Sequence, residues 1–113
     1  MSRPLGDEAE DRAAALLSAK GYEIIERNFV AKVGELDIVA RRGEFVVFVE
    51  VRSRANTRFG LPQESITEAK RRKLIKTALL YAQVRGLDCP MRFDVVAEGP
   101  DGLEHIEDAF TCD

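Results

Sequence analysis

The sequence has few of the side chains that bind soft metal ions. Its 113 residues include two cysteines, Cys89 and Cys112, and one histidine, His105. The cysteines lack the CxxC spacing of a zinc site, and a single histidine cannot complete a set of zinc ligands. We therefore exclude a zinc site and expect two unreactive thiols and an ordinary core or surface histidine.

Long hydrophobic runs are also missing. The longest strongly apolar run, Phe45 to Val49, is far shorter than the roughly 20 apolar residues that a bilayer-spanning helix needs. The amino end, MSRPLGDEAED, is acidic, whereas a secretory signal peptide is apolar. We therefore expect a cytoplasmic protein with no membrane partner.

Charge is small overall but unevenly distributed. The net charge of −3 argues, taken alone, against a protein that binds nucleic acid. Residues 41–76, however, contain ten basic and four acidic residues, a net charge of +6, and the remainder has seven basic and sixteen acidic residues, a net charge of −9. This asymmetry predicts one face that attracts polyanions.

Length and composition suit a single domain over residues 1–113, because 45% hydrophobic content can supply one core. Apolar residues at helical spacing predict a helix over 7–20, and a capping box at Ser65 to Glu68 predicts a second helix that ends at Gly86. Alternating segments predict strands over 22–30, 35–40, 45–52, 91–97 and 103–107. The order of helix, three strands, helix and two strands predicts an α/β fold.

Acidic residues interrupt the second and third predicted strands, in GELDIVARRGEFVVFVEVRSR, residues 34–54. A two-residue turn flanked by Arg41 and Glu44 divides the hairpin into two faces. One face carries Leu36, Ile38, Ala40, Phe45, Val47, Val49 and Val51, and the other carries Glu35, Asp37, Val39, Val46, Phe48, Glu50 and Arg52. Because three apolar residues share the acidic face, we expect another element to cover it.

In this register Asp37 and Glu50 are diagonal neighbours, with backbones about 7–8 Å apart. Two such carboxylates, a main-chain carbonyl and waters suit Mg²⁺ or Mn²⁺. Such an ion activates water and offsets charge on a phosphodiester under attack, and Arg52 would point at the same phosphate. The alternative is a solvent-facing surface with ordinary cross-strand ion pairs, worth at most about 1 kcal/mol each.

Several motifs resemble those of one bacterial family. They are Glu10 in a leading helix, Gly21-Tyr22, Arg27-Asn28, GELDIVA (34–40), FVEVRSR (48–54), Phe59-Gly60, Arg92-Phe93-Asp94 and Ala109-Phe110. Together they cover nearly the whole chain and resemble the YraN-type family of predicted bacterial endonucleases, also called uncharacterised protein family 0102. The resemblance implies a restriction-endonuclease-like fold, with a core of helix, three strands, helix and strand and a central mixed sheet flanked by helices.

The resemblance also implies a metal site. In that superfamily an Asp on the second core strand and the Glu of an E-x-K signature on the third bind Mg²⁺, often with a Glu from the first helix. Carried over by motif, these ligands are Asp37, Glu50 and Glu10, and the carbonyl of Val51 is a further candidate. The implied reaction is hydrolysis of DNA, in preference to RNA, by water with Mg²⁺ or Mn²⁺, and pairing of two copies as a homodimer is left open.

Arg52 stands where the signature has lysine. Lysine can lose its proton in a suitable site, whereas arginine stays charged. Arg52 can hold the scissile phosphate, but deprotonation of the water is then left to the metal or to another group. Arg52 therefore favours a rival interpretation, a noncatalytic module that binds nucleic acid or another protein on a nuclease scaffold.

Basic residues in and before the second helix are predicted to bind a phosphate backbone with little sequence preference. They are Arg54, Arg58, Lys70, Arg71 and Lys73. The helical ones cover several sides, so a solvated helix face is the alternative. We expect Tyr81 and Phe59 in the core, and Asp94 as an internal ion-pair partner of Arg92.

Overall fold

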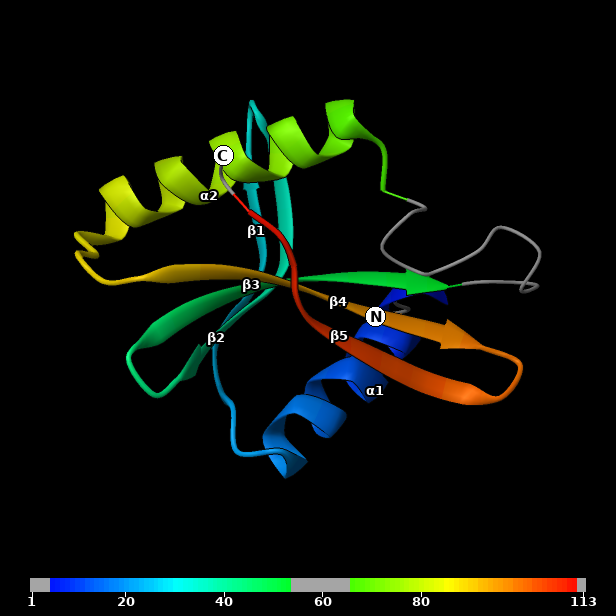
Figure 1. Cartoon of the computed structure of the whole chain (residues 1–113). Coiled ribbons are helices and arrows are strands. Elements are labelled where there is room, and N and C mark those ends of the chain that lie inside the picture. The colour runs from blue at the N-terminus through cyan, green and yellow to red at the C-terminus, as the bar shows by residue number, and fades with distance from the viewer. Residues whose placement is uncertain (1–4, 54–65, 112–113) are drawn as a thin grey trace.

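Five strands form one sheet, and a helix packs on each face of it (Figure 1). The computed structural model describes residues 5–53 and 66–111, without the side chains of residues 5–7. In chain order the elements are α1 (Leu5–Ala19), β1 (Glu23–Ala31), β2 (Gly34–Arg42), β3 (Phe45–Ser53), α2 (Glu68–Arg85), β4 (Met91–Gly99) and β5 (Gly102–Phe110). This order confirms the predicted α/β fold. Within the described residues, neither helix is long and apolar enough to cross a membrane.

The sheet is mixed, with the strands in the order β1-β2-β3-β4-β5. Neighbouring strands pair antiparallel except β3 and β4, which are parallel. Parallel neighbours need a crossover connection, and the segment that contains α2 supplies it. The segment with this helix returns the chain from the end of β3 to the start of β4, and α2 itself packs mainly against β2.

Each face of the sheet has its own apolar core. The core on the α1 side contains Ala13, Leu17, Tyr22, Ile38, Ala40, Val47, Val49 and Val96. The core under α2 contains Leu36, Val39, Val46, Phe48, Ile66, Leu74, Ala78, Tyr81, Phe93, Val95 and Phe110. The element that covers the acidic face of the hairpin is therefore α2. Tyr81 is a core residue, as predicted, and Phe59 lies outside the described residues.

The second helix begins later than its predicted capping box. Thr67 is the N-cap, and its side chain accepts a hydrogen bond from Lys70 N at 3.2 Å. Thr67 thus makes the kind of capping bond that we predicted for Ser65. Ser65 itself lies outside the described residues. At the other end Gly86 adopts a left-handed conformation with φ of 66°, which confirms the predicted stop.

The turn between β2 and β3 is one residue further along the chain than predicted. The last paired residues are Arg42 and Phe45, so Gly43 and Glu44 form the turn. Gly43, with φ of 60°, takes the first turn position, where two-residue hairpins require a positive φ. Opposed residues shift by two positions, an even number, so the acidic side chains keep their predicted face.

Leu36 contradicts the predicted division of faces, because it packs under α2 and not with Ile38 on the α1 side. On the neighbouring strand Asn28 has φ of 57°, which interrupts the extended backbone on which alternation depends. Phe29, the pairing partner of Leu36, also packs under α2. The pair has therefore turned to the other face together.

Asp94 is fully buried in a polar network that joins β4 to β5. It accepts hydrogen bonds from Arg92 Nε and Nη2, both at 2.9 Å, and from Asp108 N at 3.0 Å, and His105 Nε2 lies 2.7 Å from Oδ2. Burial raises the pKa of Asp94, but the hydrogen bonds from His105 and Arg92 outweigh it and lower the pKa to about 2. Asp94 is thus the predicted ion-pair partner, and His105 is a core histidine.

The approach of α2 to β2 depends on Gly34. A Cβ at this position would lie 2.8 Å from Thr77 Oγ1, and the glycine has φ of 154°. Thr77 is fully buried and donates a hydrogen bond to Lys73 O at 2.7 Å, so its hydroxyl is held in place. Glycine at 34 therefore sets the spacing between α2 and the strand that carries Asp37.

We expect Gly34→Ala to lower the free energy of unfolding by about 1–3 kcal/mol, because the new methyl group forces α2 away from β2. Gly99→Ala is the matched control, since a Cβ there meets no atom within 4 Å. It should change stability by less than about 0.5 kcal/mol. Denaturant unfolding of the two variants checks this, and equal losses in both would contradict it.

Candidate metal and nucleic-acid site

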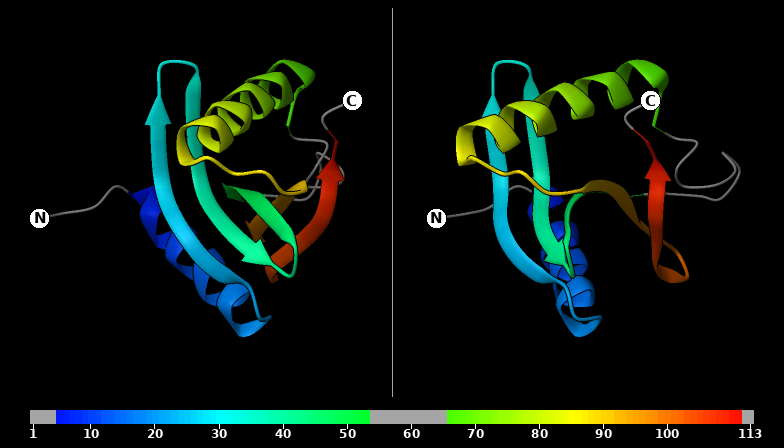
Figure 2. Two further views of the ribbon diagram at one scale, coloured as in Figure 1. Left: turned by 90° about the vertical axis from the view of Figure 1, so that its left-hand side faces the viewer. Right: turned by 60° about the vertical axis from the view of Figure 1, so that its left-hand side comes forward.

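Strands β2 and β3 separate at one end of their ladder, and Asp37 and Glu50 lie where they do so. The last paired residues are Ile38 and Val49, and the next residue on each strand is one of the two acids. Beyond this fork β2 continues beside β1 as a hairpin, and β3 continues beside β4 (Figure 2). The acids are therefore the first residues past the ladder and not the diagonal neighbours that we predicted.

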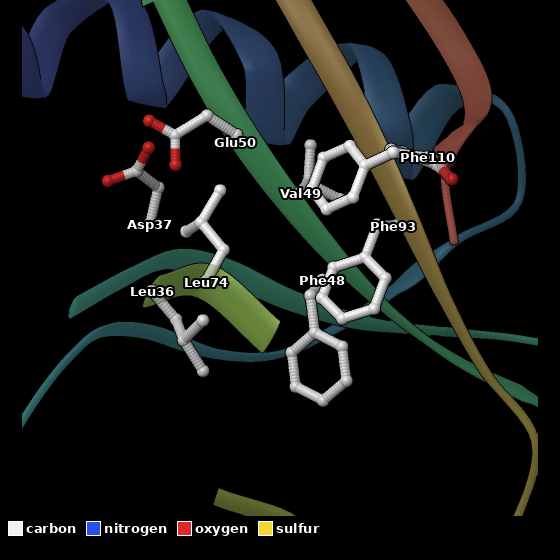
Figure 3. A pocket seen from close by; sticks show the side chains of 9 residues that line it. Leu36, Asp37, Phe48, Val49, Glu50, Leu74, Phe93 and Phe110 are labelled. Carbon is white, nitrogen blue, oxygen red and sulfur yellow. The ribbon is translucent and has the colours of Figure 1, made fainter. Parts of the chain in front are cut away.

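The Asp37 side chain takes the place of a main-chain hydrogen-bond acceptor, because the ladder between β2 and β3 has ended at this point. Its Oδ2 accepts a hydrogen bond from Val51 N at 2.9 Å. This bond fixes the carboxylate against β3, next to Glu50. Figure 3 shows the two carboxylates directed toward each other at the edge of the aromatic core.

The two acids are costly to ionise together. Burial raises the pKa of Asp37, and the charge of Glu50 raises it further, to about 7, against the lowering effect of the Val51 amide. Burial also raises the pKa of Glu50, whose side chain is 10% exposed, and Lys70 and then Arg52 partly offset this. Such a pair is stabilised by a cation placed near both carboxylates.

An open pocket of about 180 Å³ brings these acids together with lysines of α2. Its lining is Gly34, Glu35, Asp37, Glu50, Lys70, Lys73, Leu74 and Thr77. Lys70 Nζ lies 3.4 Å from Glu50 Oε1, whereas Lys73 and Glu35 are exposed. The pocket therefore presents a buried negative centre with positive charge on its α2 side.

Glu10, the predicted auxiliary ligand, is buried nearby but has a partner of its own. Its Oε1 accepts a hydrogen bond from Arg27 Nε at 2.9 Å, and Arg27 Nη2 also binds Asp11 Oδ1 at 2.7 Å. The charge of Glu10 contributes to the raised pKa of Asp37. Within the described ranges, no group of three or more His, Cys, Asp or Glu side chains is arranged to hold a metal ion.

Sequence reasoning gave Arg27 no role, although its motif was noted. Arg27 lies on β1 and forms an ion pair with Glu10 of α1. A glutamate buried on the inner side of a helix needs such a partner. The one available signal was an acidic residue in the apolar stripe of the helix, since Glu10 follows Ala9 and precedes Ala13. That signal calls for a basic partner but does not say which one.

The remaining predicted site residues separate into groups. Arg52 is partly buried on the Glu50 side of β3, and its charge lowers the pKa of Glu50. Arg71 instead faces β5, where its Nε donates to Ile66 O at 3.2 Å and its guanidinium lies 5.5 Å from the centre of the Phe110 ring. Arg54 and Arg58 lie outside the described residues. The carbonyl of Val51 as a metal ligand stays a prediction.

We expect Asp37→Asn to stabilise the protein at neutral and alkaline pH by about 1–2 kcal/mol, through the loss of a charge that burial disfavours. Because folding raises the pKa of Asp37 from 3.8 to about 7, ionisation of this residue lowers the stability of the wild type as pH rises between these values, and the variant lacks that contribution. The gain should therefore vanish below about pH 4.

Thermal unfolding between pH 4 and pH 8, without divalent ions, measures this difference. Glu35→Gln is the control, because Glu35 lines the same pocket but is exposed. It should change the pH dependence of the Tm much less than Asp37→Asn does, because the charge of Glu35 raises the pKa of Asp37 only after burial, Glu50 and Glu10. A destabilised Asp37→Asn at pH 8 would contradict the assigned cost of ionisation.

Comparison with known sequences gives the chain its relatives. The model of uncharacterised protein family UPF0102 matches residues 9–97. A UPF0102 protein of Hahella chejuensis is 44% identical over 112 residues, which cover 96% of this chain and 90% of that protein. Another, of Moorella thermoacetica, is 47% identical over 117 residues, which cover 96% of each. The matched span and these identities show that the chain belongs to the UPF0102 family, as its motifs indicated.

Proposed function

We propose that this protein is an endonuclease-like enzyme that hydrolyses phosphodiester bonds in DNA with Mg²⁺ or Mn²⁺. The observation that supports the proposal is the pair of partly buried carboxylates at the fork, Asp37 and Glu50, in a pocket lined on one side by Lys70 and Lys73. Partly buried acids close together, of which Glu50 raises the pKa of Asp37 beyond the effect of burial, favour a divalent counter-ion with oxygen ligands. Lysines beside them favour a polyanion such as a nucleic-acid backbone.

The residues present fit such an ion. Asp37 and Glu50 would hold it, and the Val51 amide keeps the Asp37 carboxylate in place beside Glu50. When bound, a divalent ion supplies a water of lowered pKa and offsets charge on the phosphate.

The basic side chains have separate tasks in this proposal. Arg52, on the Glu50 side of β3, holds the scissile phosphate through its fixed charge. Lys73, at the exposed rim of the pocket, binds another phosphate of the same DNA strand. Binding through such contacts depends on salt and has little preference for sequence.

A noncatalytic module that binds nucleic acid or another protein is the second candidate. It is favoured by the contact between Lys70 and Glu50, which neutralises one acid from within the chain, and by Arg52 in place of the signature lysine. Such a module binds a partner through the same pocket without cutting it.

The test is incubation of the protein with single-stranded, duplex and branched DNA in Mg²⁺ or Mn²⁺, with EDTA as the blank. We expect metal-dependent cutting that Asp37→Asn lowers by more than about 100-fold. Glu35→Gln, the exposed acid of the same pocket, should cut within a few-fold of the wild type. Mn²⁺ should also raise the Tm of the wild type and not that of Asp37→Asn.

The outcomes separate the two candidates. Salt-sensitive binding without cutting, unchanged by Asp37→Asn, supports the module and overturns the enzyme. Faster cutting by Arg52→Lys shows that the arginine lowers the rate of an existing nuclease. If the protein shows no cutting and no salt-dependent binding of DNA, the enzyme and a nucleic-acid-binding module are both contradicted.

A further inference from the structure

Lys70 reaches the acidic pair from α2 and not from β3. Its Nζ lies 3.4 Å from Glu50 Oε1, and its side chain is 42% exposed whereas that of Glu50 is 10% exposed. The lysine therefore extends from the surface down to a buried acid. Its main chain is fixed as well, because Lys70 N donates to the Thr67 N-cap.

The position of Lys70 on its helix is electrostatically unfavourable. It lies in the first turn of α2, where the partial positive charge of the helix dipole disfavours a cation. The acids of the fork compensate for this, since Lys70 is the foremost charge that lowers the pKa of Glu50, ahead of Arg52. The ammonium of Lys70 is therefore in position to bind an anionic ligand, which the acids alone would repel.

We propose that Lys70 is the catalytic lysine of this protein, with its ammonium in contact with the phosphate under attack and with the attacking water. This inference rests on the proposed nuclease function and deepens it. Arg52 occupies the position of the signature lysine on β3. Lys70 instead brings an ammonium group to Glu50 from α2, the next element in the chain.

Hydrolysis of a phosphodiester makes one bond, breaks another and moves two protons. The oxygen of water forms a bond to phosphorus and one of the two phosphate ester bonds breaks. The water gives up one proton to the solvent, and the departing oxygen takes one up. The ammonium of Lys70 stabilises the negative charge on the phosphate oxygens while these bonds change, and it needs to lose no proton to do so.

Lys70 is better suited to this role than its neighbours. Its ammonium has three donors on a flexible stem, so it can exchange the contact with Glu50 for a phosphate oxygen and a water. Arg52 presents a planar fork that suits a fixed clamp. Lys73 lines the same pocket one turn along the helix but is exposed, which suits contact with the backbone of the substrate.

The experiment compares Lys70→Met with Lys73→Met, two losses of charge on the same side of one helix. Single-turnover cleavage at saturating DNA gives the chemical rate, and titration of the same DNA in EDTA gives the affinity. Lys70→Met should lower the rate by about 100-fold or more with an affinity within about threefold of the wild type. Lys73→Met, which loses a contact with the DNA backbone, should weaken binding more than it lowers the saturated rate.

Relocation of the lysine provides the second measurement. In the Lys70→Met background, Arg52→Lys returns an ammonium to the Glu50 side of β3 and should recover at least about tenfold of the lost rate. Lys70→Gln repeats the test if the methionine variant does not fold, as judged from its Tm.

Two results would overturn the inference and leave the nuclease in place. One is a Lys70→Met protein that cuts at the wild-type rate while Asp37→Asn does not cut. The other is a Lys70→Met protein that loses affinity for DNA but keeps the wild-type rate at saturating DNA. A wild-type protein that cuts no DNA in Mg²⁺ or Mn²⁺ overturns the proposed function and the role of Lys70 together.

Discussion

One hydrogen bond, from the Val51 amide to the Asp37 carboxylate, holds the candidate site together. It forms where β2 leaves β3, so a side chain provides what the main chain of β2 no longer can. The cost of this arrangement is that Asp37 is partly buried with a second acid, Glu50, at close range. Burial first, and then the charge of Glu50, raise the pKa of Asp37 to about 7. The charges of Lys70 and Arg52 partly offset that cost at Glu50.

Both faces of the sheet contribute charges that act on the pair. On one face α2 brings Lys70 to Glu50, and its close approach over Gly34 places the helix against the strand that carries Asp37. On the other face Arg27 holds the buried Glu10 of α1, whose charge also reaches Asp37. The site therefore depends on the two helix packings as much as on the strands themselves.

The sequence predicted the elements and the placement of Asp37 and Glu50 on one face of the sheet, because strand alternation survives an even shift of register. The turn was placed one residue too early, yet Asp37 and Glu50 stayed on one face. Leu36 was assigned to the wrong face, because the left-handed Asn28 breaks the alternation at that point. Contacts between distant elements, such as Arg27 with Glu10, leave no periodic signal, so the sequence could not predict them.

The fork also has a mechanical side. Because the ladder between β2 and β3 ends at Ile38 and Val49, the spacing of the two carboxylates is set by the angle at which the β1–β2 hairpin leaves the rest of the sheet. A ligand that binds both acids would therefore hold the hairpin at a fixed angle to the rest of the sheet. Its binding would stiffen the β1–β2 hairpin and at the same time remove the electrostatic repulsion between the acids, so binding and the motion of the hairpin would be coupled.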